Sequence, residues 1–466
     1  MKNNKQIGIV ITDGVGFRNF VATDFLKEAN TCFSKVVILS FLPEVVYKEH
    51  DYVKVIELNT YQEFFSNWFF RKSKEISHLK SYEKDTFGIR DSLSINSSTR
   101  MSSRGIATRF IYIMTSIFKG EKSVQFFQKL QCFSFKRNKI TKQYIDILEE
   151  ENLDVLFFTH QRPPYIAPLV YAAQKLKLKT STFIFSWDNL ASKGRMASDF
   201  DYYLVWSDLM KNELLEFYKN VVSSEVRVVG TPQFEPYVDK RFGISKNDLC
   251  NMFDVNENLP IVLFTCNDSS SVNDPIYLEK LAQFIKENKL VKEINLIVRT
   301  SPVEDPLRFE TLKDKYDFIK WNYPLWKLMR SNHQESWSQR IPSLEDIDVL
   351  KSLLEYSDLV INVLSTITLD AFIFNKPVIN PVFGNDTNSM FDDQKFLKYR
   401  HLEYLVNSES SIIVKNEEDY LNAINLVLSG KDDREINRDK FLKLEISQPL
   451  KKTSKRISET LLDIVC

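Results

Sequence analysis

The stretch QIGIVITDGVGFR (residues 6–18) decides the fold class of this chain. Its first half, residues 6–12, is a mostly apolar run typical of a strand buried on both faces of a parallel sheet. A glycine-containing loop, residues 13–18, leads to an expected helix over residues 20–32, and residues 35–40 form the next expected strand. Strand, loop, helix and strand in this order predict a doubly wound α/β domain.

The alternation of strands and helices resumes after residue 150 and then starts a second time after a polar segment at 239–248. The first series has expected strands at 155–159, 182–185, 202–206 and 226–232, with a helix at 167–177. The second has expected strands at 260–265, 294–299, 359–362 and 377–380, and helices at 277–288, 345–355 and 365–374. Residues 60–145 interrupt the rhythm and are expected to be mainly helical.

We therefore predict an α/β protein with two Rossmann-like domains facing a cleft. The expected N-terminal domain spans residues 1–238 and contains the helical insertion at about 60–145. The expected C-terminal domain spans residues 239–450. A last helix, 451–466, is a candidate for packing back on the N-terminal domain.

Composition narrows the class of protein. The chain has 466 residues, of which 43% are hydrophobic and 27% charged, as in a globular protein of two or three domains. Its 62 basic residues balance 62 acidic ones, which argues against a general nucleic-acid binder. The five cysteines are scattered and predict neither a zinc site nor a disulfide framework. With no signal-peptide pattern and no apolar run of the roughly 18 residues that a membrane helix needs, we expect a cytoplasmic protein.

The strongest local signal is YSDLVINVLSTITLDAFIFNKPVIN, residues 356–380. Ser365 and Thr366 follow an expected strand and suit the first turn of a helix, where hydroxyls and unpaired N–H groups bind anions. Asp370 lies four residues after Thr366, on the same helical face, and its carboxylate is placed to hold ribose hydroxyls. The alternative is that Ser365 or Thr366 only caps the helix and that Asp370 faces solvent.

This block resembles the C-terminal signature of glycosyltransferases of the GT-B architecture. The resemblance is nearest to bacterial enzymes of surface-polysaccharide biosynthesis, including glycerophosphate and Kdo-type transferases. The matching residues are Ser365, Thr366, Asp370, Lys376 and Pro377. The resemblance spans residues 150–390 approximately and is weak before them. It implies a nucleotide-activated donor, whose diphosphate meets the hydroxyls and whose ribose meets the acidic residue.

Two further segments match the family's donor domain. The stretch INLIVRTSP, residues 294–302, resembles a strand that ends in a cation and a proline, although Thr300 and Ser301 replace the histidine of many relatives. Arg299 is expected to neutralise the donor phosphates and the departing charge, or, as an alternative, to pair with a surface acid. In the same pattern Thr265 and Asn267 lie under the donor phosphates.

The loop after the first strand supplies one candidate for the general base. Asp13 is placed to deprotonate an acceptor hydroxyl, and Arg18 to bind an anion. Gly14 and Gly16 would let the backbone approach a ligand, although the loop is not a full GxGxxG fingerprint. The alternative is that Asp13 only caps the following helix.

His160 is the rival base, because its ordinary pKa suits proton transfer near pH 7. It follows the expected strand at 155–159, and Arg162 beside it indicates an anionic partner. The alternative is a purely structural histidine.

The loop SWDNLASKG, residues 186–194, is unusually rich for a turn and is similar to loops of the surface-glycan relatives. We expect it to line the cleft. Trp187 would stack on a sugar, Asp188 and Asn189 would bind hydroxyls, and Lys193 would meet a phosphate or an acidic sugar. The alternative is a self-capped loop with a packing tryptophan.

The segment at 101–142 is basic and aromatic. Its nine basic residues accompany one acid, Glu121: Arg104, Arg109, Lys119, Lys122, Lys129, Lys136, Arg137, Lys139 and Lys142. Seven aromatic residues lie among them: Phe110, Tyr112, Phe118, Phe126, Phe127, Phe133 and Phe135. Such a composition suits either contact with an anionic membrane surface or amphipathic helices whose aromatic side packs on the domain.

Together these features predict a glycosyltransferase that moves a sugar from a nucleotide donor to a surface-glycan or lipid-linked acceptor. We expect no metal and no cofactor, because Asp199-Phe-Asp201 precedes an expected strand rather than ending one. Three alternatives remain: a nucleotide-sugar 2-epimerase of the same fold, a polyol-phosphate transferase, and a non-catalytic carbohydrate-binding protein. The expected membrane partner would make the protein peripheral at the inner face of the cell membrane.

Overall fold

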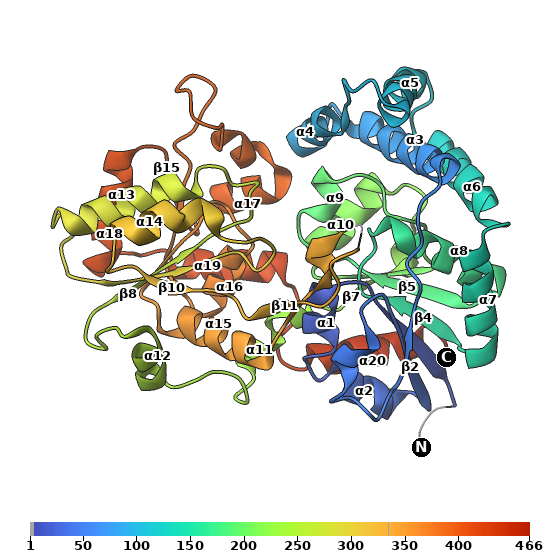
Figure 1. Ribbon diagram of the computed structural model, residues 1–466, viewed down its shortest axis with the longest axis horizontal. Coiled ribbons are helices and arrows are strands. Elements are labelled where there is room, and N and C mark those ends of the chain that lie inside the picture. The colour runs from blue at the N-terminus through green and yellow to red at the C-terminus, as the bar shows by residue number, and fades with distance from the viewer. Residues whose placement is uncertain (1–3, 334) are drawn as a thin grey trace. The chain divides into compact units, whose positions relative to one another are not determined.

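The computed structural model describes residues 4–333 and 335–466, which form two compact units (Figure 1). The first unit takes the chain up to Glu235 and again from Glu445 to Cys466, and the second unit is Pro236–Leu444. The chain therefore enters the second unit once and returns to the first for its last residues. Among the described helices, none has both the length and the apolar content needed to cross a membrane.

The first unit is built on a seven-stranded parallel sheet with the order β3-β2-β1-β4-β5-β6-β7. Its strands are β1 (Gln6–Ile11), β2 (Lys35–Ser40), β3 (Lys54–Glu57), β4 (Val155–Phe158), β5 (Lys179–Phe183), β6 (Tyr202–Val205) and β7 (Val226–Val228). The apolar side chains of β1 and β4 are completely buried, as expected for central strands covered on both faces. Strand order reverses between β1 and β4, which is where parallel sheets bind ligands beyond the strands' carboxyl ends.

Helices cover this sheet and form the insertion that the sequence predicts. They are α1 (Gly14–Phe20), α2 (Phe25–Cys32), α3 (Phe65–Tyr82), α4 (Phe87–Asn96), α5 (Ser103–Ile117), α6 (Glu121–Phe135), α7 (Lys139–Glu151), α8 (Ala167–Lys175), α9 (Asn189–Ser192), α10 (Asp208–Phe217) and α20 (Thr453–Asp463). Figure 1 shows α3, α4, α5 and α6 gathered at one side of the unit, away from the sheet. The predicted helical insertion is confirmed.

The first βα connection differs from the prediction. The expected loop at residues 13–18 is helical, because the Asp13 side chain accepts a hydrogen bond from the Gly16 backbone N–H and caps α1. The expected single helix over 20–32 is instead the end of α1, a bend, and α2. Strand β3 was not predicted, because its short sequence, KVIE, contains no apolar run. Its side chains are exposed or only partly buried, so an apolar run is not needed there.

The second unit repeats the architecture with a six-stranded parallel sheet of order β10-β9-β8-β13-β14-β15. Its strands are β8 (Ile261–Thr265), β9 (Asn295–Arg299), β10 (Lys320–Asn322), β13 (Leu359–Ile361), β14 (Val378–Pro381) and β15 (Ile412–Val414), and β11 (Trp326–Leu328) pairs separately with β12 (Arg340–Pro342). Its helices are α11 (Glu235–Val238), α12 (Lys246–Phe253), α13 (Asp274–Lys286), α14 (Glu310–Lys315), α15 (Leu344–Tyr356), α16 (Ile367–Ile373), α17 (Arg400–Ser408), α18 (Glu417–Leu428) and α19 (Glu435–Glu445). The first residue of α11, Glu235, and the last residue of α19, Glu445, belong to the first unit. Here strand order reverses between β8 and β13.

The two parallel sheets with helices between their strands confirm the predicted class of two Rossmann-like domains. The C-terminal helix α20 packs against α2 of the first unit, where Ile457 and Leu461 are fully buried. Arg456 Nε donates to the Val229 carbonyl over 2.8 Å, which ties α20 to the end of β7.

Candidate functional site

Asp13 and His160, the two rival bases of the sequence, form one hydrogen-bonded pair. His160 Nδ1 lies 2.8 Å from Asp13 Oδ2. Asp13 directly follows β1 and His160 follows β4, so the pair stands at the carboxyl ends of the two strands between which the sheet order reverses. The fold thus makes neighbours of residues that are 147 positions apart in the sequence.

The Asp13 carboxylate is fully buried and held from three sides. Besides His160, it accepts hydrogen bonds from the Gly16 N–H over 2.8 Å and from the Thr12 hydroxyl over 2.7 Å. Burial raises the pKa of Asp13, but the hydrogen bond and charge interaction with His160 and the other two bonds outweigh burial, so its pKa lies below 3.8. Asp13 is therefore an ionised acceptor that caps α1 and also orients His160.

The His160 ring is fixed on its other side by an aromatic neighbour. It stacks on Phe185 with 3.8 Å between ring centroids and 14° between planes. Burial lowers the pKa of His160 below 6.5, against the opposing effect of Asp13. The imidazole is neutral at pH 7, with its Nδ1–H directed at Asp13 and Nε2 left as an acceptor. Within the described residues, Nε2 has no hydrogen-bond partner.

The glycines of α1 serve packing. Gly14 and Gly16 are buried, and a Cβ on Gly16 would lie 2.8 Å from the Thr159 hydroxyl at the end of β4. Gly16 is thus the contact that brings α1 close to β4 and Asp13 close to His160. Arg18, in the last turn of α1, is half-buried and interacts within the protein.

Gln161, which is not among the predicted site residues, links this pair to the loop at 186–194. Gln161 is 1% exposed; its Nε2 donates to Asn189 Oδ1 over 2.8 Å, and its Oε1 accepts from the Phe185 N–H over 3.1 Å. The Asn189 amide in turn donates to Asp188 over 3.0 Å. Its position in the sequence, directly after a histidine at a strand end, is the one feature that could have predicted this role for Gln161.

The predicted sugar-binding groups of this loop are mostly engaged by the loop itself. Trp187 is 4% exposed, so its indole packs inside the unit and little of it is open to a sugar. Lys193 pairs with Asp188 at 3.2 Å. Arg162 donates to the Gly194 carbonyl over 3.0 Å and so fixes the end of the loop. This arrangement matches the alternative of a self-capped loop with a packing tryptophan.

In the second unit, the turn from β13 into α16 leaves two hydroxyls open. Ser365 and Thr366 are half-buried, and their hydroxyls have no hydrogen-bond partner among the described residues. Thr366 is the N-cap residue of α16, but no side chain makes a capping hydrogen bond there. Asn362 instead holds the turn before the helix, because its Oδ1 accepts from the Ser365 N–H over 2.8 Å and from the Thr368 hydroxyl over 3.1 Å. Asn362 therefore occupies the Ser365 N–H, so the predicted anion site is left with the two hydroxyls and the N–H groups that follow Ser365.

Asp370 lies on the buried side of α16. It is 2% exposed, and its Oδ1 accepts a hydrogen bond from the Tyr237 hydroxyl. The alternative that Asp370 faces solvent is wrong.

The loop after β8 meets the same turn. Asn267 Nδ2 donates to the Val363 carbonyl over 2.7 Å, which joins the carboxyl ends of β8 and β13 at the reversal point of the second sheet. Asp274 accepts from the Asn267 N–H over 2.7 Å, and burial raises the pKa of Asp274 to about 7. Thr265 is buried, and its hydroxyl has no partner among the described residues.

Arg299 is committed to an internal clamp. Its guanidinium donates to Asp346 over 2.8 Å and to the Asn322 amide oxygen, and only 6% of the residue is exposed. Asp346 also accepts from the Leu325 N–H and the Trp326 indole N–H, over 2.9 and 2.8 Å. Burial raises the pKa of Asp346, but Arg299 and these donors outweigh it and hold the pKa below 3.8. The predicted alternative of an ion-paired arginine is present, with a buried partner in place of a surface acid.

Across the described ranges, 4–333 and 335–466, no cluster of three or more His, Cys, Asp or Glu side chains is arranged to hold a metal ion. The Asp199 and Asp201 carboxylates of the DFD segment have other partners. Asp199 binds Arg195 at 3.3 Å and Gln125 at 3.0 Å, and Asp201 accepts from the backbone and hydroxyl of Thr180.

Solved structures share this architecture along the whole chain. A UDP-GlcNAc 2-epimerase from Methanocaldococcus jannaschii is 13% identical with a TM-score of 0.54, covering 98% of this chain and 99% of the other. A glycosyltransferase from Rickettsia africae is 13% identical with a TM-score of 0.50, covering 99% of both chains. A UDP-GlcNAc 2-epimerase from Neisseria meningitidis, solved with UDP-GlcNAc bound, is 13% identical with a TM-score of 0.50, covering 98% and 100%.

These similarities show the two-domain GT-B fold. The sequence itself matches no protein-family model and no curated protein at a significant level.

Proposed function

We propose that this protein is a GT-B glycosyltransferase that transfers a sugar from a nucleotide donor to a hydroxyl of a glycan or lipid-linked acceptor. The observation that carries the proposal is the Asp13–His160 pair at the reversal point of the first sheet, with Nε2 open and neutral near pH 7. An ionised acid that orients an imidazole in this way makes the ring a general base.

In the proposed reaction, His160 Nε2 takes the proton of the acceptor hydroxyl. The acceptor oxygen then forms a bond to the anomeric carbon of the donor sugar, while the bond from that carbon to the nucleotide diphosphate breaks. The diphosphate leaves with the electron pair. Asp13 stays ionised and stabilises the imidazolium that forms on His160.

The second unit would hold the donor. The open hydroxyls of Ser365 and Thr366 and the unpartnered hydroxyl of Thr265 lie around the reversal point of its sheet, and they are proposed to bind the diphosphate. Asp370 is proposed to bind the ribose once Tyr237 releases one of its carboxylate oxygens. Arg299 would act through its clamp on Asp346, because a direct phosphate contact requires one of its present bonds to be exchanged.

The test is a panel of UDP-, GDP-, dTDP- and CMP-linked sugars together with CDP-glycerol, assayed for hydrolysis and for transfer to lipid-linked acceptors. We expect one donor to turn over, and His160→Gln to lower kcat about 10²- to 10⁴-fold with little change in donor affinity. Thr366→Val should weaken donor binding. The control is Ser34→Ala, because Ser34 lies on an exposed bend of the first unit, outside the proposed donor site. The proposal fails if no nucleotide donor binds, or if His160→Gln turns over at the wild-type rate.

The second candidate is a nucleotide-sugar 2-epimerase, favoured by the similarity in fold to two UDP-GlcNAc 2-epimerases. Epimerisation requires proton removal from carbon 2 of the sugar and needs no acceptor. Incubation of the protein with UDP-GlcNAc alone in D₂O separates the two candidates. Deuterium at carbon 2 with formation of the 2-epimer supports the epimerase, and an unchanged substrate counts against a UDP-GlcNAc 2-epimerase.

We further propose that the helical insertion brings the first unit to an anionic membrane surface, where a lipid-linked acceptor resides. The two faces of helix α5 have the opposite of the composition that is usual for a surface helix. Its buried side is mainly small or polar, with Gly105, Thr108 and Thr115, whereas its exposed side is apolar. The exposed side chains recur at helical spacing: Ile106 (50% exposed), Phe110 (57%), Ile113 (69%) and Ile117 (78%).

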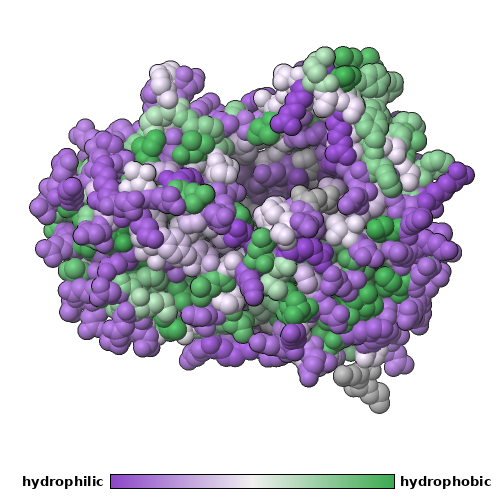
Figure 2. Space-filling view, viewed as in Figure 1, coloured by the Kyte–Doolittle hydropathy of each residue, from purple (hydrophilic) through white to green (hydrophobic). Residues whose placement is uncertain are grey.

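Neighbouring residues extend this apolar face. Met101 and Phe118 flank α5 and are 81% and 56% exposed, and Figure 2 shows hydrophobic residues gathered over this part of the molecule. Arg104 in the first turn of α5 and Lys119 just after α5 are exposed, as are Lys122 and Lys129 on α6. An apolar helix face with flanking cations suits shallow insertion among anionic headgroups, at about 1 kcal/mol for each basic residue near the surface. Of the predicted aromatic residues, Phe127 and Phe135 are buried and pack within the unit.

Sedimentation with vesicles tests this partner. We expect the protein to bind vesicles of phosphatidylglycerol and phosphatidylcholine, to bind pure phosphatidylcholine far less, and to be released as salt is raised. The double variant Phe110→Ser with Ile113→Ser should lose binding, whereas Val291→Ser, an exposed apolar residue of the second unit, should keep it. Equal binding by wild type and the double variant would refute a membrane role for α5.

A further inference from the structure

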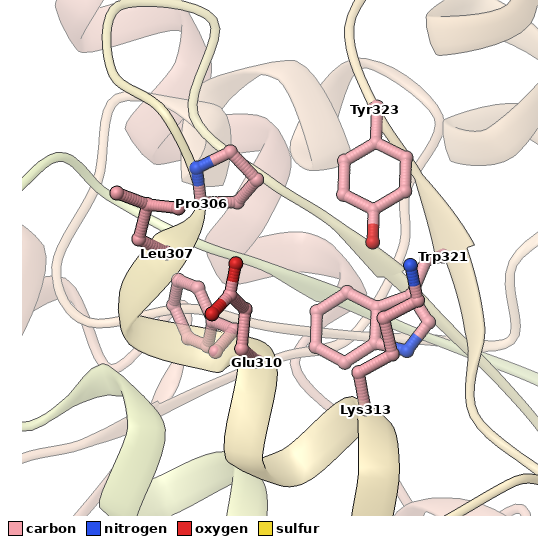
Figure 3. Close-up of a pocket in the computed structure, with 7 residues that line it drawn as sticks. Pro306, Leu307, Glu310, Lys313, Trp321 and Tyr323 are labelled. Atoms are coloured by element: carbon pink, nitrogen blue, oxygen red, sulfur yellow. The ribbon is translucent and has the colours of Figure 1, made fainter.

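A pocket lies in the second unit, on the face of β10 opposite to the one that carries Asn322. The short helical turn Leu307–Phe309 and α14 form one side, and β10 with Tyr323 forms the other (Figure 3). Side chains alternate along a strand, so Trp321 and Tyr323 share one face of β10 while Asn322 points to the other, toward Arg299. The pocket is therefore distinct from the Arg299 clamp and from the turn at Ser365.

The pocket has an aromatic floor. The Trp321 and Tyr323 rings are nearly parallel, with 10° between planes and 6.3 Å between centroids, and Figure 3 shows the two rings side by side. Phe309, which is 2% exposed, packs near Trp321 with 6.0 Å between the two ring centroids. Pro306 and Leu307 close one side, and Leu307 is 67% exposed although it is apolar.

Polar groups with complementary chemistry border this floor. Glu310 and Lys313 lie one turn apart on α14, and neither forms an ion pair or hydrogen bond with a described residue. The Lys313 ammonium lies 5.5 Å from the centre of the Tyr323 ring. The Trp321 indole N–H is buried and has no hydrogen-bond partner among the described residues. The pocket thus offers an acceptor, a donor and an unsatisfied indole N–H around a flat apolar surface.

We propose that this pocket binds one neutral sugar residue of a glycan chain. Its volume of about 220 Å³ is below the roughly 300 Å³ at which pockets for drug-sized ligands begin, so it suits a single ring. The C–H face of a pyranose packs on parallel aromatic rings, and its hydroxyls both donate to a carboxylate and accept from an ammonium. The charges of Glu310 and Lys313 balance, so the pocket has no net charge that would favour a charged sugar over a neutral one.

This site goes beyond the proposed transfer reaction, because it holds a sugar without reacting with it and does not depend on the donor. It would anchor a glycan chain through a sugar residue other than the one that carries the reacting hydroxyl. Its test is correspondingly a binding measurement that needs no turnover.

The experiment is saturation-transfer NMR on the full chain with the methyl glycosides of glucose, galactose and N-acetylglucosamine, with and without excess uridine. We expect at least one glycoside to bind wild type in the presence of uridine. Tyr323→Ala should weaken that binding about 3- to 10-fold, as expected for one aromatic contact. Glu310→Ala, which removes the acceptor, should weaken it as well.

The matched control is Tyr52→Ala, since Tyr52 is 41% exposed in the first unit and Tyr323 is 40% exposed here. Both tyrosines are at the surface, so neither change should prevent folding. The proposal is overturned if no glycoside binds wild type, if Tyr323→Ala binds as well as Tyr52→Ala, or if uridine displaces the sugar and so marks the pocket as a nucleoside site.

Discussion

At the scale of single residues, only the pair of Asp13 and His160 indicates a catalytic role. Each is a common residue at a strand end, and each alone has a structural explanation. The hydrogen bond of 2.8 Å between them turns two rival bases into one base with an orienting acid. Because the two groups are coupled, their titration belongs to the pair rather than to either residue.

The first prediction concerns the pH dependence of this pair. A base must be neutral to accept a proton, and burial lowers the pKa of His160, so the neutral form dominates above 6.5. We expect kcat/KM to be flat between pH 7 and 8 and to fall on acidification, with a midpoint below 6.5. Asp13→Asn removes an interaction that raises this pKa, so the midpoint should move further down while kcat drops about 10²- to 10⁴-fold.

A pH–rate profile of wild type and Asp13→Asn decides this point. A purely structural Asp13 would lower the amount of folded enzyme without moving the midpoint. An unchanged midpoint in the variant, or a wild-type midpoint above 7, would contradict the assignment.

The second prediction concerns Gly16. In a helix, Gly→Ala ordinarily stabilises by about 1 kcal/mol. At Gly16 the added Cβ would lie 2.8 Å from the Thr159 hydroxyl, so Gly16→Ala should instead destabilise the first unit by about 1–3 kcal/mol. Gly194→Ala is the control, since its Cβ would meet Glu75 at an ordinary 3.4 Å. Thermal unfolding of both variants measures the difference, and a higher melting temperature for Gly16→Ala would contradict the close packing.

At the scale of elements, most candidate residues lie in the turns that follow strands. The loop after β8 and the turn after β13 meet through Asn267 and Val363, because the two strands are neighbours in the sheet. The hairpin β11–β12 is different. It lies outside the parallel sheet, and Asp346 ties it to the strand end at Arg299, because this carboxylate accepts from both Arg299 and the Trp326 indole N–H.

The third prediction belongs to helix α5 and separates its two faces. Ile111 is fully buried and Ile113 is 69% exposed on the same helix. Ile111→Ser should lower the stability of the first unit by about 2–5 kcal/mol, whereas Ile113→Ser should change it by less than about 0.5 kcal/mol. Thermal unfolding without lipid makes the comparison. A large loss at Ile113 would mean that this face is covered by protein in solution.

At the scale of the whole molecule, the chain builds two Rossmann-like units and then returns to the first. The residues after 444 complete that unit: α20 packs on α2, and the Ser454 hydroxyl binds the Glu235 carboxylate. Burial is the largest influence on Glu235 and raises its pKa above 4.5. The first unit is thus made of two segments that are separated by the complete second unit.

The fourth prediction follows from this return. Ending the chain at residue 445 removes Ile457 and Leu461, which are fully buried, and exposes the surface of α2 that they cover. We expect the melting transition of the first unit to fall by many degrees or disappear, while that of the second unit remains. Removal of residues 465–466 alone is the control. Two unchanged transitions in the long truncation would show that α20 is dispensable.

The amino-acid sequence by itself determined the fold class, because apolar runs such as residues 7–11 and 359–361 carry the signature of buried parallel strands locally. It also determined that Asp13, His160 and Ser365 follow strands and that Thr265 ends one. The start of α1 was misplaced, since a glycine-rich stretch gives no helical signal until the Asp13 cap is formed.

Only the tertiary structure decided which of these residues act together. The pairing of Asp13 with His160, the clamp of Arg299 on Asp346 and the hydrogen bond from the Ser365 N–H to Asn362 are set by sheet order and by contacts that local patterns do not contain. The sequence also did not indicate which side chains are buried. Trp187 and Asp370 were predicted to contact ligands and are buried in the fold, whereas the apolar side of α5 is exposed. Periodicity shows which side chains share a face, and packing alone decides which face is covered.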